Sequence, residues 1–144
     1  MFKQLDVFLD EIQPYDNYWS TMGIDDAVGL LEKFPATAWA ALAEAIADRP
    51  ERWQVCCAEA LGEVPPSEGA QRALVTLLKT AQSVAREAAL ESCQGWLQDD
   101  WAMPSTMAGV VREAIAALRP AADAVLSTKL DELAAQLDAR EGRP

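Results

Sequence analysis

The sequence of 144 residues contains no histidine. Histidine is the commonest general base at neutral pH and the commonest zinc ligand. Its absence excludes histidine-dependent catalytic triads, HExxH zinc sites and the Glu-x-x-His pattern of di-iron bundles. The seven glycines are scattered, so the chain has no GxxxxGK[ST] or GxGxxG phosphate loop and no GxSxG nucleophile motif. We therefore predict no catalytic residues and no cofactor, and a protein that is not an enzyme.

Cysteine is scarce and occurs only as Cys56, Cys57 and Cys93. Three cysteines cannot complete a four-cysteine zinc site, and the adjacent pair lacks the usual ligand spacing. Neighbouring cysteines are also poor disulfide partners, and the odd count leaves one thiol over. The sequence predicts no metal site, and reduced thiols that pack as small hydrophobic side chains in a cytoplasmic protein.

Basic residues are few, because twelve lysines and arginines oppose 23 acids for a formal net charge of −11. An acidic surface repels nucleic acid and anionic membrane, so we expect neither as a partner. The charge fits a basic protein partner or simply a well-solvated surface. Residues 1–35 hold seven acids against two bases, and residues 87–104 hold four acids and no base. If the fold brings these two blocks together, they form one acidic patch.

Long apolar runs are absent as well. Uncharged runs such as Phe34–Ala43 are about half as long as the ~20 residues that a membrane-spanning helix needs. The first residues, MFKQLDVFLDEI, interrupt their apolar positions with charges, which argues against a signal peptide. We therefore expect a cytoplasmic protein that is not inserted in a membrane.

Alanine and leucine are abundant and recur at helical spacing, without an alternating strand pattern. The periodicity predicts about eight helices, over residues 2–13, 25–34, 36–47, 51–63, 68–80, 83–97, 105–119 and 121–139. Asp25 or Asp26 is expected to cap the second helix and Ser67 the fifth, and Pro120 is expected in the first turn of the eighth. Residues 140–144 are expected to fray.

Two stretches 29 residues apart repeat one another, Val55–Leu61 (VCCAEAL) and Val84–Leu90 (VAREAAL). Such a repeat indicates stacked helix pairs. Both stretches resemble the second helices of HEAT-like repeats, in which small alanines let successive hairpins stack closely. The resemblance is clearest over residues 36–97, with a degenerate third copy over 105–139. It implies one all-α domain over 1–144, built of antiparallel helical hairpins stacked as a short right-handed solenoid.

Two irregular stretches, over residues 14–25 and 98–105, combine aromatic and acidic side chains. Tryptophan and tyrosine supply buried anchors at interfaces, and aspartates pair with lysine or arginine. The alternative is that Trp19 and Trp101 fold back over the ends of the helical stack and that the aspartates are simply solvated. The candidate partner-binding residues are Asp16, Tyr18, Trp19, Asp25, Asp26, Asp99, Asp100 and Trp101.

A short, acidic, all-helical chain with the stretch RPERWQVCCAEALGE (49–63) also resembles the immunity proteins of polymorphic toxin systems, several of which are HEAT-like. The resemblance implies a protein that binds and neutralises a cognate secreted bacterial toxin, such as a basic nuclease, by occluding its active or substrate site. The alternative is a helical-repeat adaptor or chaperone that holds a peptide or protein of a larger assembly. In both cases we expect a protein partner that is basic.

Overall fold

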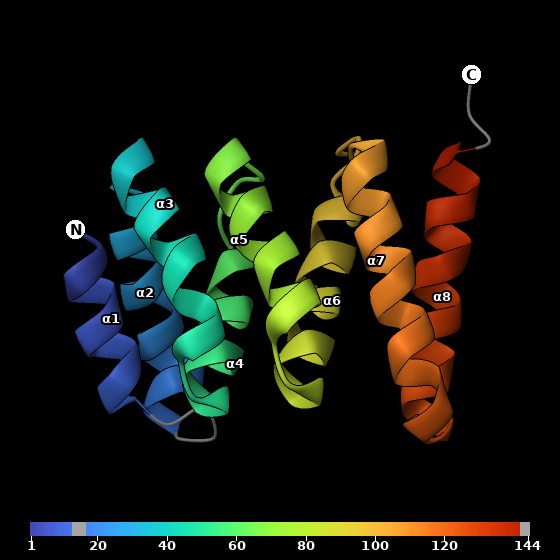
Figure 1. Cartoon of the computed structure of the whole chain (residues 1–144), viewed down its shortest axis with the longest axis horizontal. Helices are drawn as coiled ribbons and strands as arrows, with labels where there is room; N and C mark the ends of the chain where they lie inside the picture. Colours follow the sequence, from blue (N-terminus) through green and yellow to red (C-terminus); the bar gives the residue numbers. More distant parts are fainter. Residues whose placement is uncertain (13–16, 142–144) are drawn as a thin grey trace.

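A computed structural model describes residues 1–12 and 17–141 of the chain (Figure 1). Within these residues the chain forms eight α-helices and no strand, which confirms the all-α prediction. The helices are α1 (Phe2–Glu11), α2 (Ile24–Leu31), α3 (Ala36–Ala45), α4 (Glu51–Leu61), α5 (Glu68–Thr80), α6 (Ser83–Gln98), α7 (Ser105–Leu118) and α8 (Ala124–Glu141). Three short helical turns accompany them, the π-helix η1 (Trp19–Gly23) and the 3₁₀ turns η2 (Ile46–Asp48) and η3 (Arg119–Ala121).

The helices form two layers, and the chain passes from one layer to the other as it proceeds. In the view of Figure 1, α3, α5 and α7 lie in the nearer layer and α2, α4 and α6 in the farther one, with α1 and α8 towards the two ends. Each helix contacts the next helix of its own layer, so that α3, α5 and α7 form one row and α2, α4 and α6 another. This alternation is compatible with stacked helical hairpins; the right-handed HEAT-like solenoid stays a prediction.

The most extensive contact between two helices joins α4 and α6. These helices carry small buried residues, among them Ala60 and Ala89. Across the contact, Ser92 Oγ donates a hydrogen bond to the carbonyl oxygen of Ala58 at 2.6 Å. A Cβ atom on Gly62 would lie only 2.9 Å from the Cβ atom of Ser92. Small side chains therefore set a short distance between α4 and α6.

Charged groups attach α1 to the start of α4. Arg49 donates from Nε and Nη2 to the two carboxylate oxygens of Asp6, each at 2.8 Å. Trp53 Nε1 donates to the same carboxylate at 3.1 Å. Arg52 forms a second ion pair with Asp10, with 3.1 Å between Nη2 and Oδ1. The two basic side chains near the start of α4 are therefore both engaged by α1.

The segment before α2 is helical in its described part, although the sequence predicted a loop over 14–25. The π-helix Trp19–Gly23 runs directly into α2, which has no side-chain cap, so the predicted cap by Asp25 or Asp26 is wrong. A Cβ atom on Gly23 would lie 2.8 Å from Cε3 of Trp19, so glycine lets the turn close over the indole. A π-helix bonds i to i+5, so its apolar positions do not follow the α-helical period.

The remaining predicted helix ends are partly right. Ser67 caps α5 as expected, because its Oγ accepts a backbone N–H of the first turn. Pro120 does not lie in the first turn of α8 but in the preceding 3₁₀ turn, and Asp123 caps α8 instead. The last helix also extends beyond its predicted end, as far as Glu141. Residues 142–144 of the predicted frayed tail lie outside the described residues.

Candidate partner-binding groove

Two clefts adjoin on the layer formed by α2, α4 and α6. The first has a volume of about 270 Å³ and lies across these three helices. The second, of about 550 Å³, lies between the turn after α4 and the turn after α6. Gly62 and Glu63 line both clefts. Together the clefts form what we call the acidic groove, defined by Glu59, Glu63, Glu91, Asp99 and Trp101.

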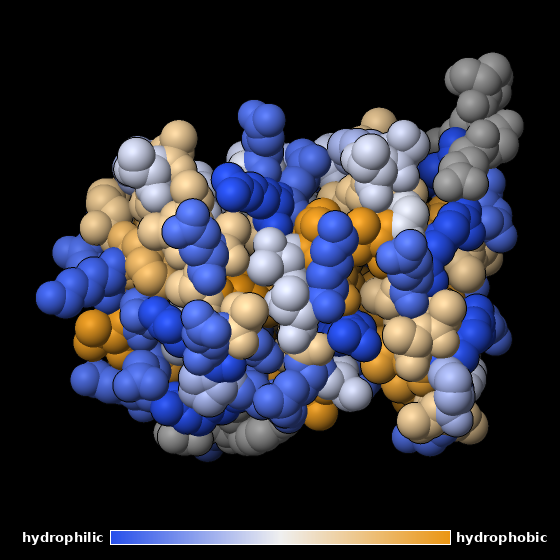
Figure 2. Space-filling model, viewed as in Figure 1, coloured by the Kyte–Doolittle hydropathy of each residue, from blue (hydrophilic) through white to orange (hydrophobic). Residues whose placement is uncertain are grey.

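The charge lining the acidic groove is of one sign. No lysine or arginine lines either cleft in the described ranges of the chain. The opposite face, of α3, α5 and α7, is the one that Figure 2 shows, and hydrophilic and hydrophobic side chains are interspersed on it. The acidic groove is therefore a local concentration of negative charge.

Glu59 is the most constrained of the groove carboxylates. It is half-buried on α4, and its Oε2 accepts a hydrogen bond from Trp19 Nε1 at 2.6 Å. Burial raises the pKa of Glu59 above its ordinary value of 4.5, the hydrogen bond from Trp19 opposes that rise, and the Glu91 carboxylate adds to it. The ionised form of Glu59 is thus held where its charge is disfavoured, and a cation in the groove would stabilise it.

Trp19 lies in the core and is not an exposed anchor in this fold. Its side chain is only 1 % exposed. The π-helix directs the indole inward, where Glu59 accepts its N–H. The prediction that Trp19 anchors a partner depended on an exposed loop, and this helical turn replaces that loop.

The other predicted residues of the first stretch that the structure describes are not part of the groove lining. Tyr18 and Asp25 are exposed, and the Tyr18 hydroxyl donates to Asp26 Oδ2 at 2.7 Å. None of these three lines the acidic groove, although Ile24 of the same segment does. Asp16 falls outside the described residues.

The second predicted stretch contributes directly to the groove. Asp99 and Trp101 line it, and Trp101 packs edge-on against Trp96 with 5.3 Å between ring centres. Asp100 is exposed, has a positive φ of 63° and lies 3.8 Å from Arg140. Arg140 also donates to the carbonyl oxygen of Trp101 at 3.1 Å. The structure therefore brings two of the three predicted residues of this stretch to the groove and ties the third to α8.

Sequence reasoning missed Glu59 and Glu63 because it summed charge by segment. Residues 36–86 hold six acids against five bases and looked nearly neutral. However, Arg49 and Arg52 form ion pairs with acids of α1. They therefore do not neutralise Glu59 and Glu63 at the other end of α4. The four-residue spacing of these two glutamates is the signal that could have found the pair, since side chains four apart share a face in the helix predicted over 51–63, although α4 ends at Leu61 and Glu63 lies in the turn that follows.

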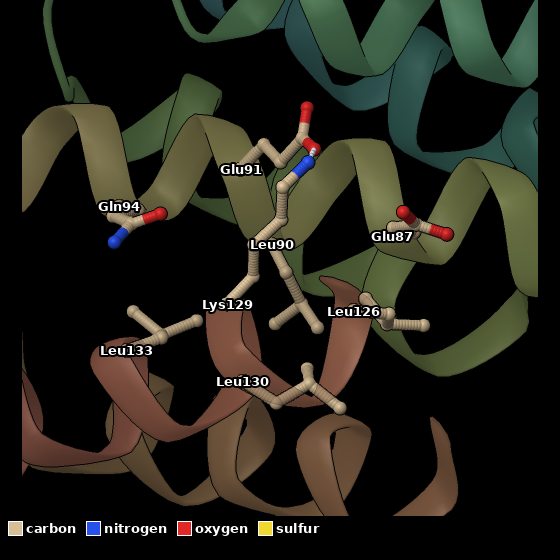
Figure 3. Close-up of a pocket in the computed structure, with 8 residues that line it drawn as sticks. All are labelled: Glu87, Leu90, Glu91, Gln94, Leu126, Lys129, Leu130 and Leu133. Carbon is tan, nitrogen blue, oxygen red and sulfur yellow. Dashed lines mark hydrogen bonds and ion pairs between the residues drawn. The ribbon is translucent and has the colours of Figure 1, made fainter. Parts of the chain in front are cut away.

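A further depression lies between α6 and α8 (Figure 3). Its floor consists of four leucines, Leu90, Leu126, Leu130 and Leu133. Lys129 extends from α8 towards α6, and its Nζ lies 3.0 Å from Glu91 Oε1 (Figure 3). The free space is about 10 Å³, no more than one water molecule needs. This depression is a gap between packed helices and not a binding site. The ion pair across it, between Lys129 and Glu91, holds Glu91 at the edge of the acidic groove.

The three cysteines offer little nucleophilic chemistry. All are free and buried. Burial raises the pKa of Cys56 and of Cys93 to about 12, and it raises the pKa of Cys57 as well. Thiols are therefore the dominant form at neutral pH, and they are shielded from reagents.

The residues described include no group of three or more acidic, cysteine or histidine side chains placed to hold a metal ion. None of their helices combines the length and apolarity that crossing a membrane requires. No family model, no curated protein and no solved structure matches the chain. The function must therefore be inferred from the acidic groove.

The raised pKa of Glu59 predicts how stability depends on pH. Because the folded protein binds this proton more tightly than the unfolded chain does, the contribution of Glu59 to stability falls as the pH rises from below 4.5 through the folded pKa. Glu59→Gln cannot ionise, yet it keeps an oxygen that can accept the hydrogen bond from Trp19. The free energy of unfolding of the variant minus that of the wild type should therefore increase between about pH 4 and about pH 7.

Urea denaturation at the two pH values measures this difference. Glu113→Gln, on the exposed surface of α7, is the matched control for the loss of one negative charge. A Glu59→Gln difference that stays constant across the range, or falls, contradicts the assignment of Glu59 as a carboxylate disfavoured in its charged form.

Proposed function

We propose that this protein is a non-enzymatic binding protein that receives a basic surface of a protein partner in its acidic groove. The observation that carries the proposal is the gathering of Glu59, Glu63, Glu91 and Asp99 around two adjoining clefts that no basic side chain of the described residues lines. A half-buried carboxylate with a raised pKa is a group whose charge a basic partner compensates. Complementary charge also steers association and fixes the orientation of docking.

The partner that we propose is a secreted bacterial toxin with a basic active or substrate site, such as a nuclease, and the protein would then be its immunity protein. The net charge of −11 and the sequence resemblance to acidic all-helical immunity proteins support this choice. A nuclease presents lysine and arginine side chains to the phosphates of its substrate. An acidic groove that pairs with those side chains excludes the substrate from the toxin.

Affinity capture from the native host, followed by mass spectrometry, tests the proposal. We expect a basic toxin, encoded next to this gene, whose activity is abolished by co-expression or by addition of the purified protein. Capture of a component of a secretion or assembly system, with no inhibition of any toxin, would favour the adaptor or chaperone role and contradict the immunity role. A partner with an acidic contact surface would contradict the acidic groove in either role.

Reversing charge within the groove is expected to weaken binding of that partner. The double variant Glu63→Lys and Asp99→Lys should raise its Kd at least about tenfold, because attraction is replaced by like-charge repulsion. It should also reduce the dependence of Kd on salt between about 50 and about 500 mM. Calorimetric titration at the two salt concentrations measures both effects.

The matched control is Glu113→Lys and Glu132→Lys, which changes net charge equally on exposed positions of α7 and α8 away from the groove. It should alter Kd far less than the groove variant. Equal losses in the two double variants would mean that overall charge, and not the acidic groove, determines affinity.

A further inference from the structure

We infer that the cleft beside Trp96 and Trp101 is a subsite for a guanidinium group, which takes an arginine side chain of the partner. The assignment to a partner rests on the proposed function, whereas binding of the guanidinium itself can be measured without any partner. The cleft has a volume of about 550 Å³ and is lined by two aromatic, two acidic and two proline residues together with Gly62 and Val64. That space accommodates the end of a long side chain.

The aromatic wall of the cleft is fixed in place. Trp96 is buried, and its Nε1 donates to the carbonyl oxygen of Val64 at 3.0 Å. Trp101 stands edge-on to it, with an interplanar angle of 76°, and remains partly exposed. Two side chains that are already in contact lose little freedom when a ligand binds beside them.

The charges at the cleft select the class of ligand. Glu63, from the turn after α4, and Asp99, at the end of α6, both line it and both are exposed. Neither takes part in an ion pair among the residues that the structure describes. An anion would be repelled here, and a neutral apolar group would desolvate the carboxylates without compensating them. A cation with a flat apolar face avoids both penalties.

A guanidinium meets these requirements better than an ammonium. It is planar and weakly hydrated, stacks on aromatic faces and donates in parallel to carboxylate oxygens. Tryptophan is the aromatic side chain that attracts cations most strongly. The combination of Trp101 with Glu63 and Asp99 therefore favours arginine over lysine.

Arg140 holds the loop that carries Trp101 without filling the cleft. Its guanidinium donates to the carbonyl oxygens of Trp101 and Leu97 and lies 3.8 Å from the Asp100 carboxylate. It is not among the residues that line the cleft. Because α8 fixes this loop from behind, the position of Trp101 is set before a ligand arrives.

The test uses the full chain and a small probe, N-acetyl-arginine methylamide, followed by the indole N–H signals of the tryptophans in ¹H–¹⁵N NMR spectra. We expect saturable shifts of the Trp96 and Trp101 signals, with a Kd on the order of millimolar, as befits a fragment-sized ligand. Trp101→Phe assigns the Trp101 signal. Trp53, which is fully buried in the core, is an internal control and should not shift.

Matched probes and variants decide the chemistry. The citrulline analogue, which is neutral but similar in shape, should bind at least about tenfold more weakly. Asp99→Asn and Glu63→Gln should each weaken the arginine probe about threefold to tenfold, whereas Glu113→Gln should leave it unchanged. Any of three results would overturn the guanidinium assignment. The citrulline analogue could bind as tightly as the arginine probe, the corresponding lysine analogue could do so, or both carboxylate variants could leave the Kd of the arginine probe unchanged.

The two proposals fail separately. If the arginine probe binds but capture from the host yields no basic partner, the subsite stands and the proposed function fails. If a basic partner binds through the acidic groove while the Trp101 signal does not move, the guanidinium subsite fails and the proposed function stands.

Discussion

Trp19→Ala is expected to lower the free energy of unfolding by about 3–5 kcal/mol, as truncation of a buried aromatic side chain does. The indole is 1 % exposed and closes against Gly23, where a Cβ atom would lie 2.8 Å from its ring. Truncation leaves a cavity under the π-helix. It also leaves the half-buried Glu59 carboxylate without the N–H that it accepts at 2.6 Å. Urea denaturation followed by circular dichroism measures the loss.

Trp101→Ala is the matched comparison, because it removes the same side chain from the end of the groove. Trp101 is partly exposed and its main described contact is the edge-on packing against Trp96, so we expect a loss of about 1 kcal/mol. The effects on binding should rank the other way. Trp101→Ala should weaken binding of the partner and of the arginine probe more than Trp19→Ala does. A stability loss from Trp19→Ala no larger than that from Trp101→Ala would contradict the placement of Trp19 in the core.

The eight helices could be predicted because their apolar positions repeat at the α-helical period. That signal fails where the backbone leaves the α-helical geometry. The π-helix Trp19–Gly23 looked like a loop for this reason, and the 3₁₀ turn at Pro120 looked like the start of α8. In both segments the backbone hydrogen-bond pattern differs from that of an α-helix, and the spacing of apolar residues in the sequence does not reveal that difference.

The repeat between Val55–Leu61 and Val84–Leu90 aligns residues that are buried in both helices at Ala60 with Ala89 and at Leu61 with Leu90, but its first pair differs in exposure. Val55 is 4 % exposed, while Val84 is 43 % exposed. The cause is where each helix begins. Val55 lies in the second turn of α4, which starts at Glu51, whereas Val84 lies in the first turn of α6, which starts at Ser83. A sequence offset aligns residues but not helix ends, so the two valines occupy different environments.

The acidic groove was half predictable. Asp99 and Trp101 follow from composition, because aromatic and acidic residues cluster in an irregular stretch. Glu59 and Glu63 belong to a segment whose charges nearly cancel, and only the folded chain shows that the cancelling arginines face α1. Trp19 and Trp101 both lie among aromatic and acidic residues in the sequence, yet the first is buried and the second is partly exposed. The conformation of a single backbone turn decides whether such a side chain points into the core or towards solvent.

Ala89→Leu and Ala60→Leu are each expected to lower the free energy of unfolding by about 1–3 kcal/mol through overpacking. Both alanines are fully buried on the helices that make the most extensive contact in the fold. The same contact leaves no room for a Cβ atom on Gly62 beside Ser92. A larger side chain must therefore push α4 and α6 apart or adopt a strained rotamer.

The matched control is Ala117→Leu, the same change on the exposed surface of α7, which should alter stability by no more than about 0.5 kcal/mol. Because Glu59 lies on α4, Glu63 on the turn after it and Glu91 on α6, separating these helices would widen the acidic groove and weaken the coupling between Glu59 and Glu91. The overpacked variants should thus lose affinity for a partner even where they remain folded. If Ala60→Leu and Ala89→Leu are as harmless as Ala117→Leu, the close approach of α4 and α6 is wrong, and with it the geometry that gathers the groove carboxylates.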